Sequence, residues 1–458
     1  MGVCRPRGRC DGAAAEAGYG SPVSDGVATT PARDRSAIGR SPGGSGGSGG
    51  GTPWSWREPL VLYAAVLVVL AAVVWLGARG GPVDVYGLRP SSYTGSWLLG
   101  GWFRFDAGWY DIIAREGYSY AGPDLQSSVA FFPAYPLALA ALHALTGLDV
   151  PLLGTLVTVA AGAGAVVLFH HWCARRLGPR AARTAVVVLV VYPYAWYLFG
   201  AVYADALFLA AVLGAFVLLE HDHPVWAGLV GAVATATRPV GAALVLGLVA
   251  VTLMRRHVIV ARPGSPWRPA LRLRSLRPAD AGVLLSAAGL AGWMAYLWST
   301  FGNPVAFQAV QQAPGWDQGS GPTTWFKVTF FGHLGDLPHD VRGWVDGSAP
   351  AAFADGLYTT GIALQAVLMA VFVALVVVVW RRIGWGYAVY AAGVIAVPLL
   401  GSKDFQGVGR YLLAAFPCLA AAALVLTDRP LLRRIWLPVS GLLLCGWAFA
   451  FARGYYVA

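Results

Sequence analysis

The residues best suited to chemistry lie in one aromatic stretch that follows the first long apolar segment. This stretch reads Trp102-Phe-Arg-Phe-Asp-Ala-Gly-Trp-Tyr110 and places Arg104 and Asp106 among aromatic side chains. A carboxylate in such surroundings is partly desolvated, and this environment suits it to work as a base. Arg104 and Asp106 could instead pair with each other or anchor a helix end, so a structural interpretation stays open.

A single carboxylate is enough for one kind of sugar transfer. A glycosidase usually needs two, because one must protonate a poor leaving group. A sugar on a lipid phosphate leaves as a stable anion, so one base for the acceptor hydroxyl and cations for the phosphate suffice. Asp106 is our candidate base, whereas Asp111 and Glu116 are interpreted as solvated surface acids.

Two arginines are candidate ligands of such a phosphate. Arg238 lies between apolar runs directly before Pro239, which interrupts helical hydrogen bonding. A guanidinium there could clamp a phosphate with two parallel hydrogen bonds, or pair with Asp205 to hold helices together. Arg410 precedes Tyr411 at the predicted start of another helix, where it could contact the phosphate or simply anchor the helix.

Asp205 follows Tyr203 in a short turn between two apolar runs. Acidic residues at membrane depth are costly and tend to be functional, which favours a site role. Asp is also a common helix N-cap, so a turn or cap role stays open.

The other polar residues indicate neither a metal nor a nucleotide site. His333 and His339 lack partners at metal-ligand spacing, and the five cysteines show no such spacing either. The sequence has no Gly-rich phosphate loop and no Asp-x-Asp triplet, so we expect no cofactor. Trp316 and Trp325 could stack on sugar rings, although interfacial tryptophan belts give the same pattern.

The composition places the chain among membrane proteins. Of its 458 residues, 57% are hydrophobic and 12% charged, whereas a soluble domain carries roughly 25% charged residues. The net charge of +11 arises from arginines in the N-terminal tail and in short loops, so it does not indicate a nucleic-acid partner. Several apolar segments approach the ~20 residues of a membrane span; examples are 60–78, 151–172, 357–380 and 434–451.

The sequence predicts two regions. Residues 1–53 are rich in Gly, Ser, Arg and Pro, and we interpret them as a disordered cytoplasmic tail. Residues 54–458 should form an all-α bundle of about eleven transmembrane helices in the cell membrane, with a large first extracytoplasmic loop.

Arginine positions predict the orientation of this bundle. Loops rich in arginine should be cytoplasmic, namely 175–183, 255–277, 381–382 and 429–434. The aromatic segments 79–132, 301–356 and 401–409 should then be external, together with the candidate site. All arginine-rich loops can be cytoplasmic only if 133–147 does not cross the membrane, so we predict a helix along or dipping into the outer face there. For the same reason 225–254 should form two short spans that meet near Arg238.

Three runs in the first loop resemble the signature of PIG-V-type mannosyltransferases, which are GT-C membrane glycosyltransferases. They are Arg104-Phe-Asp-Ala-Gly-Trp-Tyr110, Ile113-Ala-Arg-Glu-Gly-Tyr118 and Phe131-Phe-Pro-Ala-Tyr-Pro136. Shorter similarities follow in the same order at 192–208, 236–241 and 409–417. The resemblance covers residues 60 to about 452, and the residue usage is typical of a GC-rich bacterial genome.

The resemblance implies an inverting transfer of mannose from a polyprenyl-phosphate-mannose donor to an extracytoplasmic glycan, glycolipid or protein. Asp106 takes the place of the family's first-loop catalytic acid, and Asp205 stands where the family usually has Glu. Ala206 replaces the usual Ser, so the role of Asp205 is less defined. We expect Arg238 and Arg410 to bind the donor phosphate, and further substrate contacts from Arg104, Trp109, Tyr110, Asp205 and Tyr411.

Other functions fit parts of the same pattern. A related GT-C enzyme could use another lipid-linked sugar, and pocket shape would decide between them. A lipid-sugar flippase or transporter should carry related halves or paired broken helices. We find no internal repeat, and the polar residues gather at one predicted face, which favours an enzyme. The acceptor, any partner subunit and the oligomeric state are not encoded in a recognisable pattern.

Overall fold

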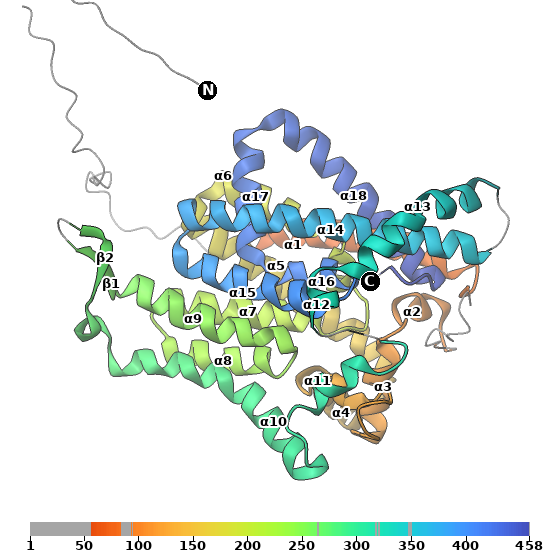
Figure 1. Cartoon of the computed structure of the whole chain (residues 1–458), viewed down its shortest axis with the longest axis horizontal. Helices are drawn as coiled ribbons and strands as arrows, with labels where there is room; N and C mark the ends of the chain where they lie inside the picture. Colours follow the sequence, from red (N-terminus) through yellow and green to blue (C-terminus); the bar gives the residue numbers. More distant parts are fainter. Residues whose placement is uncertain are drawn as a thin grey trace, which may run out of the picture. The chain divides into compact units, whose positions relative to one another are not determined.

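A computed structural model describes residues 56–83, 93, 95–262, 265–316, 318, 321–346 and 350–457. The tail predicted for residues 1–53 lies outside the described residues. Helices dominate the described chain (Figure 1). The α-helices are α1 (Arg57–Ala78), α2 (Trp97–Trp102), α3 (Ala107–Glu116), α4 (Ala134–Thr146), α5 (Val150–Leu177), α6 (Pro179–Val190), α7 (Asp205–Glu220), α8 (Pro224–Thr235), α9 (Ala242–Arg255), α10 (Ala288–Phe301), α11 (Ala306–Ala309), α12 (Pro322–Trp325), α13 (Val328–Asp346), α14 (Pro350–Arg382), α15 (Trp385–Gly401), α16 (Val408–Leu413), α17 (Phe416–Asp428) and α18 (Pro430–Arg453).

Short 3-10 helices connect or extend several of these elements. They are Ser128–Ala130, Ala195–Leu198, Pro239–Gly241, Leu273–Ser275, Pro278–Ala287 and Val310–Gln312. Proline in the first turn starts α5, α6, α8, α17 and α18, where its missing N–H costs no hydrogen bond. Gly147 and Gly302 end α4 and α10 in the left-handed conformation that glycine adopts without steric cost.

Five helical segments of the described chain are long and apolar enough to cross a membrane. They are Arg57–Ala78, Val150–Leu177, Pro278–Phe301, Phe353–Arg382 and Pro430–Arg453. Shorter apolar helices lie beside them: Ala134–Thr146, Pro224–Thr235, Pro239–Arg255, Trp385–Gly401 and Phe416–Asp428. The chain is therefore a helical, multi-pass membrane protein, and the total of about eleven spans stays a prediction.

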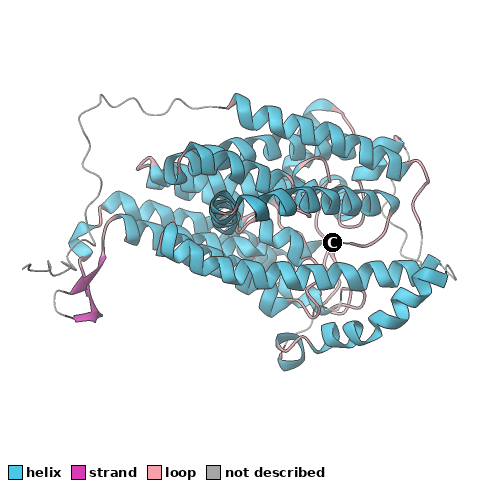
Figure 2. Ribbon diagram, turned by 90° about the horizontal axis from the view of Figure 1, so that it is seen from above, coloured by secondary structure: helices cyan, strands magenta, loops and turns pink. Residues whose placement is uncertain are grey.

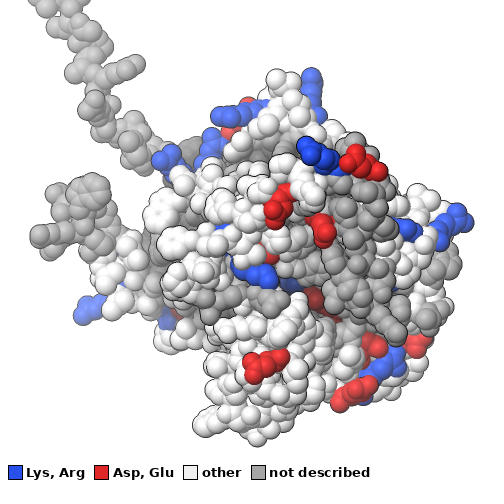
Figure 3. Space-filling model, turned by 45° about the vertical axis from the view of Figure 1, so that its right-hand side comes forward, with Lys and Arg blue, Asp and Glu red and all other residues white. Residues whose placement is uncertain are grey.

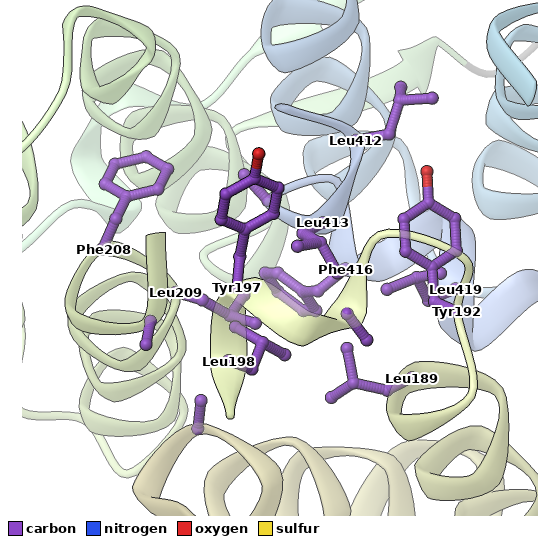
Figure 4. Close-up of a cluster of buried hydrophobic side chains, with 14 of the residues drawn as sticks. Leu189, Tyr192, Tyr197, Leu198, Phe208, Leu209, Leu412, Leu413, Phe416 and Leu419 are labelled. Atoms are coloured by element: carbon purple, nitrogen blue, oxygen red, sulfur yellow. The ribbon is translucent and has the colours of Figure 1, made fainter. Parts of the chain in front are cut away.

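The helices pack through buried aromatic and aliphatic side chains. Helix α7 packs between α5 and α8, α9 packs on α15, and α1 packs on α18 (Figure 1). Figure 2 shows the same helices from above, with the two described strands at one end of the molecule. Side chains from α6, α7, α16, α17 and the 192–204 segment meet in one core (Figure 4). Large uncharged areas separate the charged side chains on the face shown in Figure 3, as expected of a protein whose sides contact lipid.

Two predictions about local structure are confirmed and one is incomplete. The helix predicted at 133–147 is α4, and the break predicted near Arg238 separates α8 from α9. The 255–277 loop, however, contains an antiparallel hairpin of β1 (Ile259–Arg262) and β2 (Ser265–Leu271). Strand β2 contains two prolines, which lack the backbone N–H that a strand uses for pairing. An edge strand tolerates proline where its N–H would face away from the partner strand. A run with two prolines is therefore not predicted as a strand from sequence.

Candidate functional site

The backbone around Asp106 is held by a buried tyrosine. The Asp106 N–H donates to the Tyr203 hydroxyl at 3.2 Å, and this hydroxyl donates to the Arg104 carbonyl at 3.2 Å. Tyr203 is buried at the base of the site. Phe105, directly before Asp106, has a left-handed φ of 52°, which is rare for a bulky residue. Such local strain concentrates at functional sites, where surrounding contacts maintain it.

The Asp106 carboxylate faces Arg410 rather than its own helix. Asp106 is the N-cap residue of α3, yet its side chain caps no N–H of that helix. Its Oδ2 accepts a hydrogen bond from an Nη of Arg410 at 2.8 Å, although 304 residues separate the two. Because both side chains remain partly accessible, at 19% and 16%, a substrate group can reach the pair.

Arg410 retains an unused hydrogen-bond donor at this position. Its Nε is buried and has no hydrogen-bond partner among the described residues. An unpaired buried donor atom is costly, and an acceptor on a bound ligand would satisfy it. A phosphate oxygen is an acceptor of the required charge and geometry.

Arg238 forms the second cation of the site. It has an extended backbone where α8 ends, directly before the 3-10 helix Pro239–Gly241. Its guanidinium forms an ion pair with Asp205, the first residue of α7, and both side chains are over 90% buried. The pairing considered from sequence as a structural role for Arg238 is therefore present.

Tyr411 joins the two ion pairs. The Arg238 guanidinium lies 4.4 Å from the centre of its ring, and the Arg410 guanidinium lies 5.8 Å from it. Burial raises the pKa of the Tyr411 hydroxyl, but Arg238 and then Arg410 outweigh this effect, and the pKa falls below its ordinary value. The site thus combines two carboxylates and two guanidiniums around one phenol, with no net charge.

The other predicted substrate contacts divide into buried and accessible residues. Arg104 is 3% exposed and donates from Nε and Nη to the Ala452 carbonyl, at 3.2 and 3.0 Å. Arg104 thus ties the loop to the end of α18 and does not pair with Asp106. Tyr110 is buried edge-on against Tyr135. Trp109 is half-buried, one helical turn after Asp106.

Two aromatic residues near Asp106 escaped the sequence analysis. Tyr203 stands two residues before Asp205, so its place in a segment already singled out was an available signal. Tyr456 packs edge-on against Phe105 at 4.9 Å between ring centres. It follows the last helix, in a stretch whose sequence carries no recognisable motif.

Histidines and acids of the described residues do not assemble into a metal-binding group. No set of three or more His, Cys, Asp or Glu side chains there could hold a metal ion. His333 contacts the Tyr358 ring, and Asp111 pairs with Arg115 one turn along α3 at 2.8 Å. The latter pair is an ordinary exposed ion pair of a helix surface.

This arrangement can accept a proton and hold an anion at the same place. Asp106 supplies a carboxylate oxygen, while Arg410 and Arg238 supply donors for an anionic group. Tyr411 and Tyr203 line the space around these charges with aromatic rings. Base and anion-binding chemistry are therefore available together.

Sequence comparison points to one group of curated proteins. The chain is 33% identical over 189 residues to GPI alpha-1,6-mannosyltransferase 2 of Mus musculus, a match covering 38% of this chain and 36% of that protein. It is 35% identical over 157 residues to the Cricetulus griseus protein of the same name, covering 31% and 30%. The matches thus span about a third of each relative, and no family model matches the chain.

Structural comparison gives more remote similarities. The oligosaccharyltransferase of Archaeoglobus fulgidus matches with a TM-score of 0.41 and 15% identity, over 85% of this chain and 53% of that one. ArnT from Cupriavidus metallidurans, solved with undecaprenyl phosphate, matches with a TM-score of 0.43 and 16% identity, over 87% and 76%. These scores are too low to establish a shared fold. The chain is thus a multi-pass helical membrane protein with partial sequence similarity to GPI alpha-1,6-mannosyltransferase 2.

Proposed function

We propose that this protein is a GT-C glycosyltransferase that transfers mannose from polyprenyl-phosphate-mannose to an acceptor hydroxyl outside the membrane, with inversion at the anomeric carbon. The observation that carries the proposal is the Asp106–Arg410 pair, with its unpartnered Arg410 Nε, beside Arg238 and Tyr411. The partial sequence similarity to GPI alpha-1,6-mannosyltransferase 2 supports the choice of mannose.

The reaction needs one base and one anion-binding group. Asp106 takes the proton of the acceptor hydroxyl as its oxygen attacks the anomeric carbon and forms the new C–O bond. The bond from that carbon to the phosphate oxygen breaks on the opposite face, and its electron pair leaves with the polyprenyl phosphate. Arg410, through its free Nε, and Arg238 bind the phosphate as its charge grows from about −1 to about −2.

The pairing of Arg410 with Asp106 serves both partners of this reaction. The guanidinium of Arg410 holds the Asp106 carboxylate in place through a 2.8 Å hydrogen bond. In this proposal the donor phosphate binds at the remaining edge of the same guanidinium, so that one side chain positions base and leaving group together. Because phosphate is already a good leaving group, the mechanism uses no general acid and no metal.

The arginine-rich end of α7, which lies opposite the candidate site, supports an external position for that site. Asp205 begins α7 at the candidate site, and Glu220 ends α7 about 24 Å away. Around Glu220 lie Arg176 and Arg255 from the ends of α5 and α9. Arginine-rich ends face the cytoplasm in most membrane proteins, which supports our proposal that the Asp106 end is outside.

Donor selectivity tests the proposal. Membranes from cells that express the chain, and from cells with an empty vector, would receive radiolabelled polyprenyl-phosphate-mannose or the corresponding glucose or arabinose lipid. We expect label to move from the mannose lipid alone, and only in membranes that contain the chain. Transfer from another sugar lipid would contradict the mannose assignment, and consumption of none of them would favour the flippase or a partner subunit.

A further inference from the structure

Two external segments far apart in sequence meet beside Asp106 and present an aromatic surface. Trp109 of α3 lies 5.8 Å from Trp316 and 5.8 Å from Phe131, measured between ring centres. Phe131 and Trp316 are 6.0 Å apart, so the three rings form a closed triangle. All three residues are half-buried. We call this triangle the tryptophan platform.

The turn that carries Trp316 is held in place by specific contacts. The Trp316 N–H donates to the carbonyl of buried Ala313 at 3.1 Å. Gly315 has a φ of 90°, which a residue with a Cβ rarely adopts. Gln126 of the first loop donates to the Pro314 carbonyl at 3.0 Å and fixes the turn against that loop. Trp316 is thus positioned rather than loosely exposed, because two hydrogen bonds and the left-handed conformation of Gly315 define the turn.

The helices around this turn hold the two segments together. Helix α11 packs against the 3-10 helix Ser128–Ala130, close to α3 and α4 (Figure 1). Phe307 of α11 contacts Phe132 at 5.1 Å between ring centres. The segment that ends in Trp316 therefore belongs to the same packed unit as the Asp106 loop.

These three rings could serve packing alone, but their position beside Asp106 and their partial exposure favour a binding role. Asp106 and Trp109 are three residues apart on one helix, so their side chains lie on the same face. Rings buried only to complete a core are usually covered, as are Phe132 and Trp293 in the neighbouring cluster. The three platform residues are instead only half-buried, and Trp109 lies one helical turn after the candidate base.

The platform rings have no cation-π contact with Arg238 or Arg410 among the described residues. Each arginine ring contact at the site goes to Tyr197, Tyr203 or Tyr411 among the described residues, and none goes to Trp109 or Trp316. In an inverting displacement the acceptor and the departing phosphate occupy opposite faces of the anomeric carbon. We therefore assign to the acceptor's side the surface that follows Asp106 along the chain and has no ring contact with the two arginines.

We propose that Trp109 and Trp316 form an acceptor subsite that binds a neutral sugar ring by stacking, so the acceptor is a glycan or glycolipid whose terminal residue is a neutral sugar. The inference rests on the proposed function. A sugar presents an apolar C–H face that packs on an indole ring, while its hydroxyls remain free for hydrogen bonds. An uncharged aromatic surface gives no compensation for a charged acceptor, so peptides rich in charge are disfavoured.

Kinetics with a defined acceptor source test the subsite. The acceptor would be a lipid extract of the expressing cells, titrated by its total hexose content, with labelled polyprenyl-phosphate-mannose as donor. We expect Trp316→Leu, which retains apolar bulk but lacks a flat ring, to raise the acceptor KM about tenfold. The donor KM should stay within about twofold, and Trp316→Phe should recover most of the affinity.

Trp325→Ala is the matched control, because Trp325 is an external tryptophan with 56% of its surface exposed and should leave both KM values unchanged. An unchanged acceptor KM in Trp316→Leu would overturn the subsite, as would a raised donor KM. Equal losses of kcat in Trp316→Leu and Trp316→Phe, with a lower melting temperature, would assign Trp316 to packing alone. Failure of the wild-type protein to transfer mannose would instead count against the proposed function.

Discussion

Arg410 links the two halves of the candidate site at the scale of single residues. Its guanidinium bonds to the Asp106 carboxylate through Nη and leaves Nε without a partner among the described residues. A lysine ammonium has the same charge but lacks the planar fork that can serve two groups at once. The geometry, more than the charge, should therefore decide how well position 410 works.

Arg410→Lys should raise the donor KM about tenfold, because it removes the second donor edge while keeping a positive charge. Initial rates at increasing donor concentration measure this effect. Arg115→Lys, at an exposed ion pair on α3, is the control and should have wild-type kinetics. A donor KM equal to that of wild type in Arg410→Lys would show that phosphate does not bind at this fork.

Asp205 should matter for stability as well as for activity. Its partner Arg238 is over 90% buried, so Asp205→Asn leaves an uncompensated buried cation and should cost about 3 kcal/mol. Thermal unfolding in detergent, followed by intrinsic fluorescence, measures the loss. Asp111→Asn changes an exposed pair and should have little effect. Equal melting temperatures for the two variants would contradict a buried ion pair.

The sequence identified the residue types of the site and the possible Arg238–Asp205 pair, but not the partner of Asp106. Asp106, Arg238, Arg410 and Tyr411 were expected from their chemistry, and the structure brings them together. The pairing of Asp106 with Arg410 spans 304 residues and depends on the packing of α3, α7 and α16, which no local pattern encodes. Arg104 looks in sequence like a partner of Asp106, but it bonds to the Ala452 carbonyl instead.

Close helix contact positions the site at the scale of elements. Tyr63 of α1 donates to the Leu198 carbonyl at 2.7 Å, and Thr158 of α5 donates to the Ala201 carbonyl at 3.0 Å. A Cβ built on Gly162 of α5 would lie 1.9 Å from the Leu198 carbonyl oxygen. The position of the segment that leads to Tyr203 and Asp205 therefore requires glycine at position 162, because any side chain there would collide with the Leu198 backbone.

Gly162→Ala should displace this segment, because the added Cβ meets the Leu198 backbone, which cannot move aside as a side chain can. We expect a lower melting temperature and a rate of mannosyl transfer reduced several-fold. Gly164→Ala on the same helix is a matched control, since a Cβ there meets no atom within 4 Å. The activity and melting temperature of the two purified variants provide the comparison. Similar behaviour of both would show that α5 and the 195–201 segment are not in tight contact.

Helix boundaries were easier to predict than the hairpin. Prolines and glycines mark where helices begin and end, and the break at Pro239 follows from its missing N–H. The hairpin of β1 and β2 lies in an arginine-rich loop without alternating apolar residues, so no period of two was visible. A helix was predicted to start near Arg410, but its division into the short α16 and the longer α17 was not predicted.

Orientation is the main property at the scale of the whole molecule. Asp124 follows α3 in the predicted external loop, and Arg381 ends α14 in a predicted cytoplasmic loop; both side chains are exposed. A membrane-impermeant maleimide should label Asp124→Cys on intact cells and Arg381→Cys only after permeabilisation. The parent protein, labelled alongside, gives the background from its own cysteines. The reverse pattern would place the candidate site in the cytoplasm.

The central claim is that Asp106 is the base that activates the acceptor. The most direct measurement is mannosyl transfer from labelled polyprenyl-phosphate-mannose by Asp106→Asn, compared at equal expression with wild type and with Asp111→Asn. An amide cannot accept the acceptor proton, so we predict a loss of at least about a hundredfold for Asp106→Asn and a near wild-type rate for Asp111→Asn. Normal transfer by Asp106→Asn would contradict this assignment.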